Sequence, residues 1–381
     1  MTRAALLALA FALAACGPRR GAAPPPLPAS GRAVSASALA APDPRERLAA
    51  YVAQSTHGET LADTARMRAL FATLAAEGFG SVCIEAQSPD GGRLFADGGL
   101  VRTIEEARAT GLRVSLAYAP LLAPPDALNS WMQESAQGER DGGRARQWSP
   151  AIPDVYRAIL AEWDELLASG PDEVLLVGVR WSGPHADIGV DARAAFERWF
   201  GVETTDWPAE VLPERARRGP LAPAWVAWRA QALRDLVAGL RERQRAAAPR
   251  MRLALLVDGH YPAHLRGGLN WAAPRSSGEM IDYGETGAGH LVDDVVLGLW
   301  APGADPRETA IAGYSPGVNR EALLSTAREL LPPATGMRGA LFLDDLGPTG
   351  KVDAAKSLLE GCDGLLLLPP ADWVAELRGA P

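Results

Sequence analysis

The sequence from Glu173 to Val179 reads EVLLVGV, and that from Arg252 to Asp258 reads RLALLVD. Each is a short, continuous apolar run next to polar residues, which is typical of parallel strands that are covered on both faces. Six further runs of this kind occur in the chain. The full set is 48–53, 81–86, 113–119, 173–179, 252–258, 294–300, 339–345 and 364–370.

Longer amphipathic segments separate the runs and predict helices. They cover 61–77, 154–168, 224–248, 319–331 and 352–359. Eight strand-like runs separated by such segments predict an α/β protein with a single (β/α)8 TIM barrel, with extra length in the fourth connection, residues 182–223. An open doubly wound sheet is the alternative, but no glycine-rich phosphate loop follows any of the strands.

The amino-acid composition excludes some classes of function. The chain has 381 residues and a formal net charge of −8, so nucleic acid, which requires a concentrated basic face, is not an expected partner. Charged residues make up 22% and hydrophobic residues 48%, which are values of a globular protein. The eleven Trp residues outnumber the seven Phe residues, so indole rings are available for stacking against a ligand.

The N-terminal residues predict a targeting signal rather than part of the folded domain. Arg3 precedes an uncharged run, 4–15, that is too short to span a bilayer and fits a signal peptide. Leu13-Ala14-Ala15-Cys16 follows the bacterial lipobox pattern, so we expect cleavage after Ala15 and lipidation of Cys16. An ordinary signal peptide is the alternative. Gly17 follows the cysteine instead of a retention aspartate, which favours the periplasmic face of the outer membrane if the cell is Gram-negative.

Residues 16–44 are rich in Ala, Pro and Gly and predict a flexible tether, so the barrel is expected to occupy 45–381. Cys83 and Cys362 both lie in strand-like runs, and we expect two buried thiols. Neither cysteine has the spacing of a metal ligand, and the five histidines are scattered, so no metal or other cofactor is expected.

The strand ends predict where a site would lie, because barrel enzymes carry their reactive groups at the C-terminal ends of the strands. Glycoside hydrolysis needs two carboxyl groups, and the expected catalytic candidates are Glu85, Asp187 and Asp258. The expected substrate-binding residues are Tyr118, Arg180, Trp181, Trp271, Trp300 and Asp344.

Each of these residues also has a structural interpretation. The Trp side chains are equally expected to pack helices against the barrel. Asp258 precedes Gly259 and fits a turn, and Asp344 with Asp345 fits a solvated loop. The hypothesis depends on the joint pattern of acids and aromatic rings.

The order of segments resembles the bacterial glycosyl-hydrolase-like family ten, a (β/α)8 group related to amylase-type barrels. The similarity runs from about Leu48 to Trp373. It includes Trp148-Ser149-Pro150, the following helix, and the segment around Phe196-Glu197-x-Trp199-x-Gly201. The resemblance implies a glycan substrate, either polysaccharide or peptidoglycan strands.

The chain departs from this family in the fourth strand. Arg180 and Trp181 match the family's Arg-Tyr, but its acidic position falls on Val177. Two hypotheses follow, an envelope-anchored glycoside hydrolase that uses other carboxylates, and an inactive barrel that binds glycan. A two-lobed solute-binding lipoprotein is a third.

Overall fold

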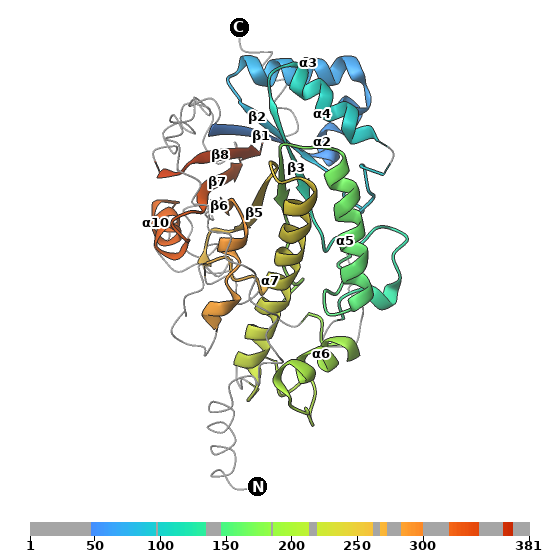
Figure 1. The fold of residues 1–381 in the computed structure, drawn as a ribbon, viewed down its shortest axis with the longest axis vertical. Helices are drawn as coiled ribbons and strands as arrows, with labels where there is room; N and C mark the ends of the chain where they lie inside the picture. Colours follow the sequence, from blue (N-terminus) through green and yellow to red (C-terminus); the bar gives the residue numbers. More distant parts are fainter. Residues whose placement is uncertain are drawn as a thin grey trace.

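The computed structural model describes residues 47–134 except Asp97, and then 146–183, 186–212, 219–261, 267–272, 283–299, 320–342 and 361–368. Eight parallel strands form a closed barrel in sequence order, β1 to β8, with β8 paired to β1 (Figure 1). The strands are Leu48–Val52 (β1), Ser81–Glu85 (β2), Arg113–Tyr118 (β3), Glu173–Leu176 (β4), Arg252–Asp258 (β5), Asp294–Gly298 (β6), Gly336–Phe342 (β7) and Gly364–Leu368 (β8). The predicted TIM barrel is confirmed, and the open sheet and the two-lobed protein are excluded.

Helices cover the outside of the barrel. They are Gln54–Ala62 (α2), Thr64–Ala76 (α3), Gly99–Ala109 (α4), Pro153–Ala168 (α5), Val190–Phe200 (α6), Ala222–Ala247 (α7) and Arg320–Leu330 (α10). In Figure 1, α5 and α7 run side by side along the barrel wall, where Trp163 of α5 donates from Nε1 to the carbonyl oxygen of Leu240 on α7, 2.9 Å away. Within the described residues, no helix is long and apolar enough to cross a membrane.

The sequence predicted most of these elements and missed three helices. The predicted segment 61–77 corresponds to α3, which begins after Asp63 because the side chain of Asp63 caps it on the backbone amides of Ala65 and Arg66. The α2, α4 and α6 helices were not predicted, and β7 begins at Gly336 rather than at Gly339. The predicted helix 352–359 lies outside the described residues.

Successive side chains along each strand point alternately into the barrel and outward, so the strands contribute to two separate hydrophobic cores. One set of side chains fills the barrel interior, with Ala49, Cys83, Ala117, Leu175, Ala254, Val296, Ala340 and Leu366 as its buried members. The alternate set packs outward against the helices. Both Cys83 and Cys362 are buried free thiols, as predicted.

The N-terminal end of the barrel interior is polar. Arg338 of β7 lies 2.8 Å from Glu173 Oε2 of β4 and 3.4 Å from Asp294 Oδ2 of β6. Arg252 reaches Asp294 from the exposed side at 2.6 Å, and Ser115 donates to Glu173 at 3.0 Å. We call the set Arg338, Glu173, Asp294, Arg252 and Ser115 the base network. It closes the end of the barrel opposite the mouth with mutually neutralising charges.

Candidate functional site

Strand parity decides which side chains form the floor of the mouth, the C-terminal end of the barrel interior. Tyr51, Val177 and Leu368 pack against the interior core. Glu85 lies two residues after the interior residue Cys83, and Asp258 two residues after Leu256, so both acids belong to the interior set at strand ends. The floor therefore combines two carboxylates, a tyrosine and two aliphatic side chains.

Glu85 is held on both of its carboxylate oxygens. The Tyr51 hydroxyl of the neighbouring strand β1 donates to Oε1 at 2.8 Å, and the backbone amide of Gln54, the first residue of α2, donates to Oε2 at 2.7 Å. The amide belongs to a helix N-terminus, where unpaired N–H groups favour an anion. The carboxylate is therefore fixed in orientation by two donors from different elements.

Tyr51 is a functional candidate that the sequence analysis missed. Burial, followed by the negative charge of Glu85, raises the pKa of the Tyr51 hydroxyl, so this group remains a protonated donor in ordinary buffers. The signal was present in the sequence, since Tyr51 lies two residues from Ala49 in the run LAAYV and therefore shares its side of the strand.

Asp258 is the last residue of β5, and β3 and β4 lie between β5 and β2. In an eight-stranded barrel this places Asp258 and Glu85 on different sides of the floor. The side chain is half-buried, and its Oδ1 accepts the backbone amide of His260 at 2.9 Å. Asp258 therefore makes the turn contact that the sequence predicted and also lies on the floor.

Asp187 lies in the chain between β4 and α6 rather than at a strand end. It is buried, and its Oδ2 accepts a 2.6 Å hydrogen bond from the hydroxyl of Ser149, which precedes α5. Its φ of 61° is in the left-handed region, which an aspartate tolerates better than most residues. Asp187 thus joins the loop after β4 to the loop before α5.

The end of β4 carries no acid. Val177 points into the interior, where the resemblance expected a carboxylate. Gly178 follows with a φ of 61°, and Arg180 is exposed beside the backbone of Gly267. An exposed guanidinium at this position remains available to a carboxylate or a sugar hydroxyl.

The predicted aromatic subsites are buried, which corrects the expectation for three residues. Tyr118 has the opposite parity to the interior residue Ala117, so it points outward and donates to Glu162 of α5 at 2.9 Å. Trp181 stacks on Trp228 of α7 with ring centroids 5.9 Å apart. Fully buried rings of this kind pack helices against the barrel and present no face to a sugar.

Trp271 follows the same pattern, buried with its ring edge against Tyr261 at 5.1 Å. Among the described tryptophans, an exposed indole occurs on α6 instead. Trp199 of α6 is 41% exposed and Phe200 is 37% exposed, with ring centroids 4.8 Å apart. Since α6 follows the end of β4, this pair lies on the mouth side of the barrel (Figure 1).

Three predicted residues, Trp300, Asp344 and Cys16, lie outside the described residues. Among the residues that the structure does describe, no group of three or more His, Cys, Asp or Glu side chains is arranged to hold a metal ion.

Comparison with known proteins shows the fold but not a family. No family model matches the chain, and no curated protein sequence matches it. Membership of glycosyl-hydrolase-like family ten is therefore not shown.

Solved structures do match. The beta-galactosidase from Bacillus circulans sp. alkalophilus aligns with a TM-score of 0.57 at 12% identity, covering 86% of this chain and 50% of that one. The beta-galactosidase from the Antarctic haloarchaeon Halorubrum lacusprofundi gives 0.55 at 14%, covering 85% and 52%. That from the psychrophilic Marinomonas ef1 gives 0.52 at 11%, covering 68% and 42%. The chain thus spans about half the length of these proteins or less, and its barrel is distantly similar in fold to those of glycoside hydrolases.

Proposed function

We propose that the chain is an envelope-anchored lipoprotein whose barrel mouth hydrolyses glycosidic bonds in polysaccharide or peptidoglycan strands. The observation that supports this most is Glu85, an interior-facing carboxylate at a strand end with a donor on each oxygen. Such preorganisation is expected of a group that stabilises positive charge as it develops in a transition state.

The two floor carboxylates supply the chemistry. Glu85, oriented by Tyr51 and by the Gln54 amide, attacks the sugar or activates water, and Asp258 across the floor protonates the leaving oxygen. Arg180 orients a substrate hydroxyl or carboxylate at the rim. Lipidation of Cys16 holds the barrel at the membrane, close to the polymers of the cell envelope.

The test is release of reducing ends from purified peptidoglycan strands and from a panel of polysaccharides. Glu85→Gln and Asp258→Asn are each expected to lower the rate at least 100-fold, the usual contribution of a catalytic acid or base. Asp187→Asn is the matched control, because Asp187 lies beyond the end of β4 and binds Ser149, and its rate per folded molecule should stay near that of the wild type. Equal rates for all four proteins would contradict the assignment.

Val177 favours a second candidate, a barrel that binds glycan without cutting it. Where the resemblance expects an acid, an aliphatic side chain lines the interior. The exposed Trp199 and Phe200 then provide the sugar-stacking surface. This candidate predicts saturable glycan binding without product, with affinity lost on Trp199→Ala and retained on Val101→Ala, an exposed apolar residue on α4.

A further inference from the structure

We infer that the N-terminal face of the barrel, opposite the mouth, binds the anionic headgroups of a phospholipid bilayer through an arginine-lined groove. Binding of this face to lipid would set the direction of the barrel mouth relative to the membrane. That orientation rests on the proposed lipid anchor, whereas the lipid binding itself does not. The inference is also independent of whether the barrel hydrolyses glycan.

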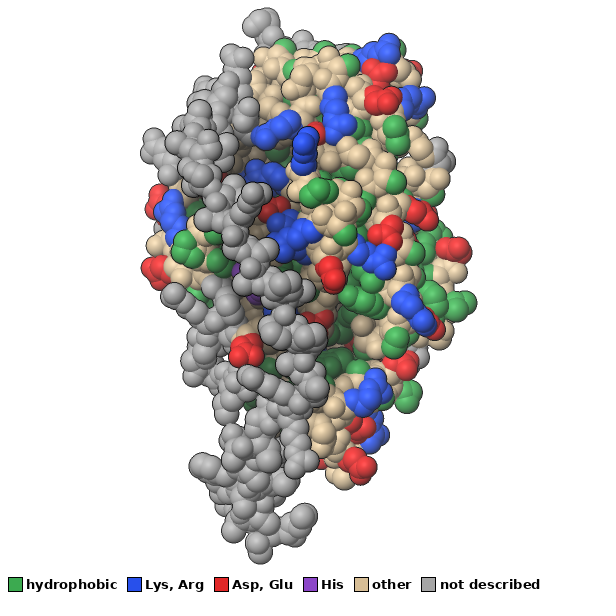
Figure 2. Space-filling view, in the orientation of Figure 1, with side chains coloured by type: hydrophobic (Ala, Val, Ile, Leu, Met, Phe, Trp, Pro, Cys, Tyr) green, Lys and Arg blue, Asp and Glu red, His purple; other side chains and the backbone are tan. Residues whose placement is uncertain are grey.

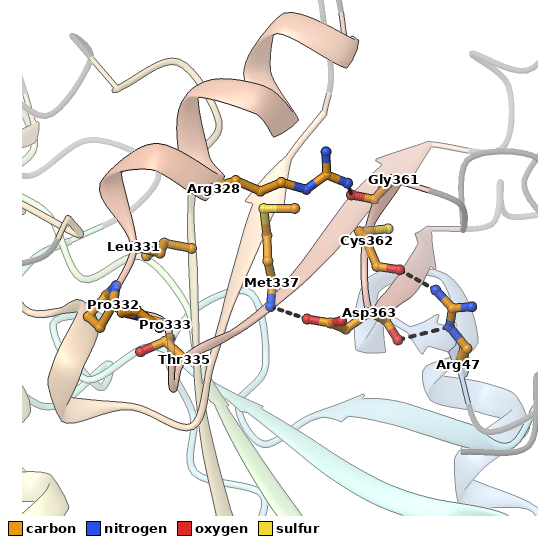
Figure 3. Close-up of a pocket in the computed structure, with 10 residues that line it drawn as sticks. All are labelled: Arg47, Arg328, Leu331, Pro332, Pro333, Thr335, Met337, Gly361, Cys362 and Asp363. Carbon is orange, nitrogen blue, oxygen red and sulfur yellow. Dashed lines mark hydrogen bonds between the residues drawn. The ribbon is translucent and has the colours of Figure 1, made fainter. Parts of the chain in front are cut away.

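Two hollows form this groove, which we call the basic groove. One has a volume of about 560 Å³ and the other about 440 Å³, and they share Pro332 and Thr335 on their walls. Figure 3 shows the smaller one, with Arg328 and Arg47 on either side of the 361–363 backbone. The arginines that line the two hollows are Arg241, Arg245, Arg250, Arg252, Arg47 and Arg328.

The acidic side chains in the groove are already engaged. Both oxygens of Asp293 accept from the guanidinium of Arg241, at 2.5 and 2.8 Å, and Asp363 accepts the backbone amide of Met337 at 2.8 Å. Arg252 is paired with Asp294 of the base network.

Positive charge remains after these pairs are made. Arg245 and Arg250 are exposed and have no partner among the described residues. Arg328 donates to the carbonyl oxygen of Gly361, which carries no net charge. In Figure 2, Lys and Arg side chains gather around the upper end of α7, the end that Arg241 and Arg245 occupy. The groove is therefore positively charged although the chain as a whole has a formal net charge of −8.

The position of Arg47 favours membrane lipid headgroups as the anions that the groove binds. Arg47 lies in the groove and is the residue through which the chain from Cys16 enters the barrel. The roughly 30 intervening residues reach at most about 100 Å, so the tether alone leaves the barrel free to present any face to the bilayer. Arginines beside an anionic leaflet select one face, and here the selected orientation turns the mouth away from the membrane.

The test uses the full chain with Cys16→Ser, which removes the acylation site, in flotation with vesicles at low ionic strength. We expect binding to vesicles of phosphatidylglycerol and phosphatidylcholine, and little to phosphatidylcholine alone. Each arginine beside an anionic bilayer changes partition roughly fivefold, so Arg245→Ala with Arg250→Ala should weaken it about 25-fold. Both side chains lack partners among the described residues, so the fold should be unaffected, which circular dichroism checks.

The control is Arg102→Ala with Arg198→Ala, which removes the same charge from exposed positions on α4 and α6. The control should bind like the parent chain. Equal partition into the two kinds of vesicle, or an equal loss in the control, overturns the inference. Inorganic phosphate that releases the chain at an ionic strength where chloride does not would show that the groove takes a free anion, which also overturns it.

Discussion

Tyr51 and Tyr118 both lie near the C-terminal ends of strands, but Tyr51 points into the barrel and Tyr118 points outward. Tyr51 shares the interior side with Ala49 and meets Glu85, whereas Tyr118 follows the interior residue Ala117 and meets Glu162 on α5. The sequence contains this information, because interior and exterior side chains alternate strictly along a strand. Counting parity from the small interior residues would have found Tyr51 and excluded Tyr118.

The pair of tyrosines provides a matched test of the site. Tyr51→Phe keeps the ring and removes the donor to Glu85, so glycan hydrolysis should fall about tenfold, as expected for a lost hydrogen bond to a charged group. Tyr118→Phe makes the same chemical change on the outer side and should leave the rate per folded molecule unchanged. Initial rates of reducing-end release measure both. A Tyr51→Phe protein as active as the wild type would show that this hydroxyl does not support catalysis.

Among the elements, α6 and the loop after it form the insertion that the sequence predicted only as extra length. Few apolar positions mark α6, because only Ala192 and Phe196 are buried on it. Its C-terminal end is fixed by polar contacts, in which Glu197 Oε1 accepts from the amide of Thr204 at 2.9 Å and from Arg193 at 2.9 Å. With so few buried apolar positions, α6 carries only a weak periodic signal in its sequence, so the helix was missed.

Glu197 gives this element a pH dependence. Hydrogen bonds from the side chain and amide of Thr204, and then from Arg193, lower the pKa of Glu197 from 4.5 to about 2. Because the folded pKa lies below the unfolded one, its stabilising contribution is complete above about pH 4.5 and is lost as the pH falls towards 2.

We therefore expect Glu197→Gln to lower the urea midpoint at pH 6, and the difference from the wild type to shrink between pH 4.5 and 2. Urea unfolding curves at half-unit intervals measure this. Glu203→Gln, at an exposed neighbouring position, is the control and should leave the urea midpoint at pH 6 near that of the wild type. A difference between Glu197→Gln and the wild type that is constant with pH would contradict the assigned contacts.

For the whole molecule, the closed barrel was predictable because strands covered on both faces read as continuous apolar runs. The base network was not, since Glu173, Asp294 and Arg338 are far apart in sequence and only the register of β4, β6 and β7 brings them together. The direction of the Trp181 ring was equally hidden, because Trp181 lies beyond the end of β4, where packing against Trp228 of α7 decides it.

The base network predicts a large cost for a single substitution. Arg338→Met leaves Glu173 and Asp294 without their buried counter-charge, which should lower the free energy of unfolding by about 3–5 kcal/mol. Arg252→Met removes a half-exposed partner of Asp294 and should cost at most about 1 kcal/mol. Urea denaturation at neutral pH compares the two. Similar costs for both variants would show that the network does not stabilise the barrel as a buried charge pair.

The central claim is that glycan contacts the mouth of the barrel at the ends of β2 and β5. Hydrogen exchange of the full-length protein, with and without a saturating glycan strand, tests this whether or not the bond is cut. Protection should appear in peptides covering Glu85–Ser88 and Asp258–Tyr261, while peptides covering Arg245–Arg252 on the opposite face remain unchanged. Protection confined to the opposite face, or absent from both strand ends, would contradict the account.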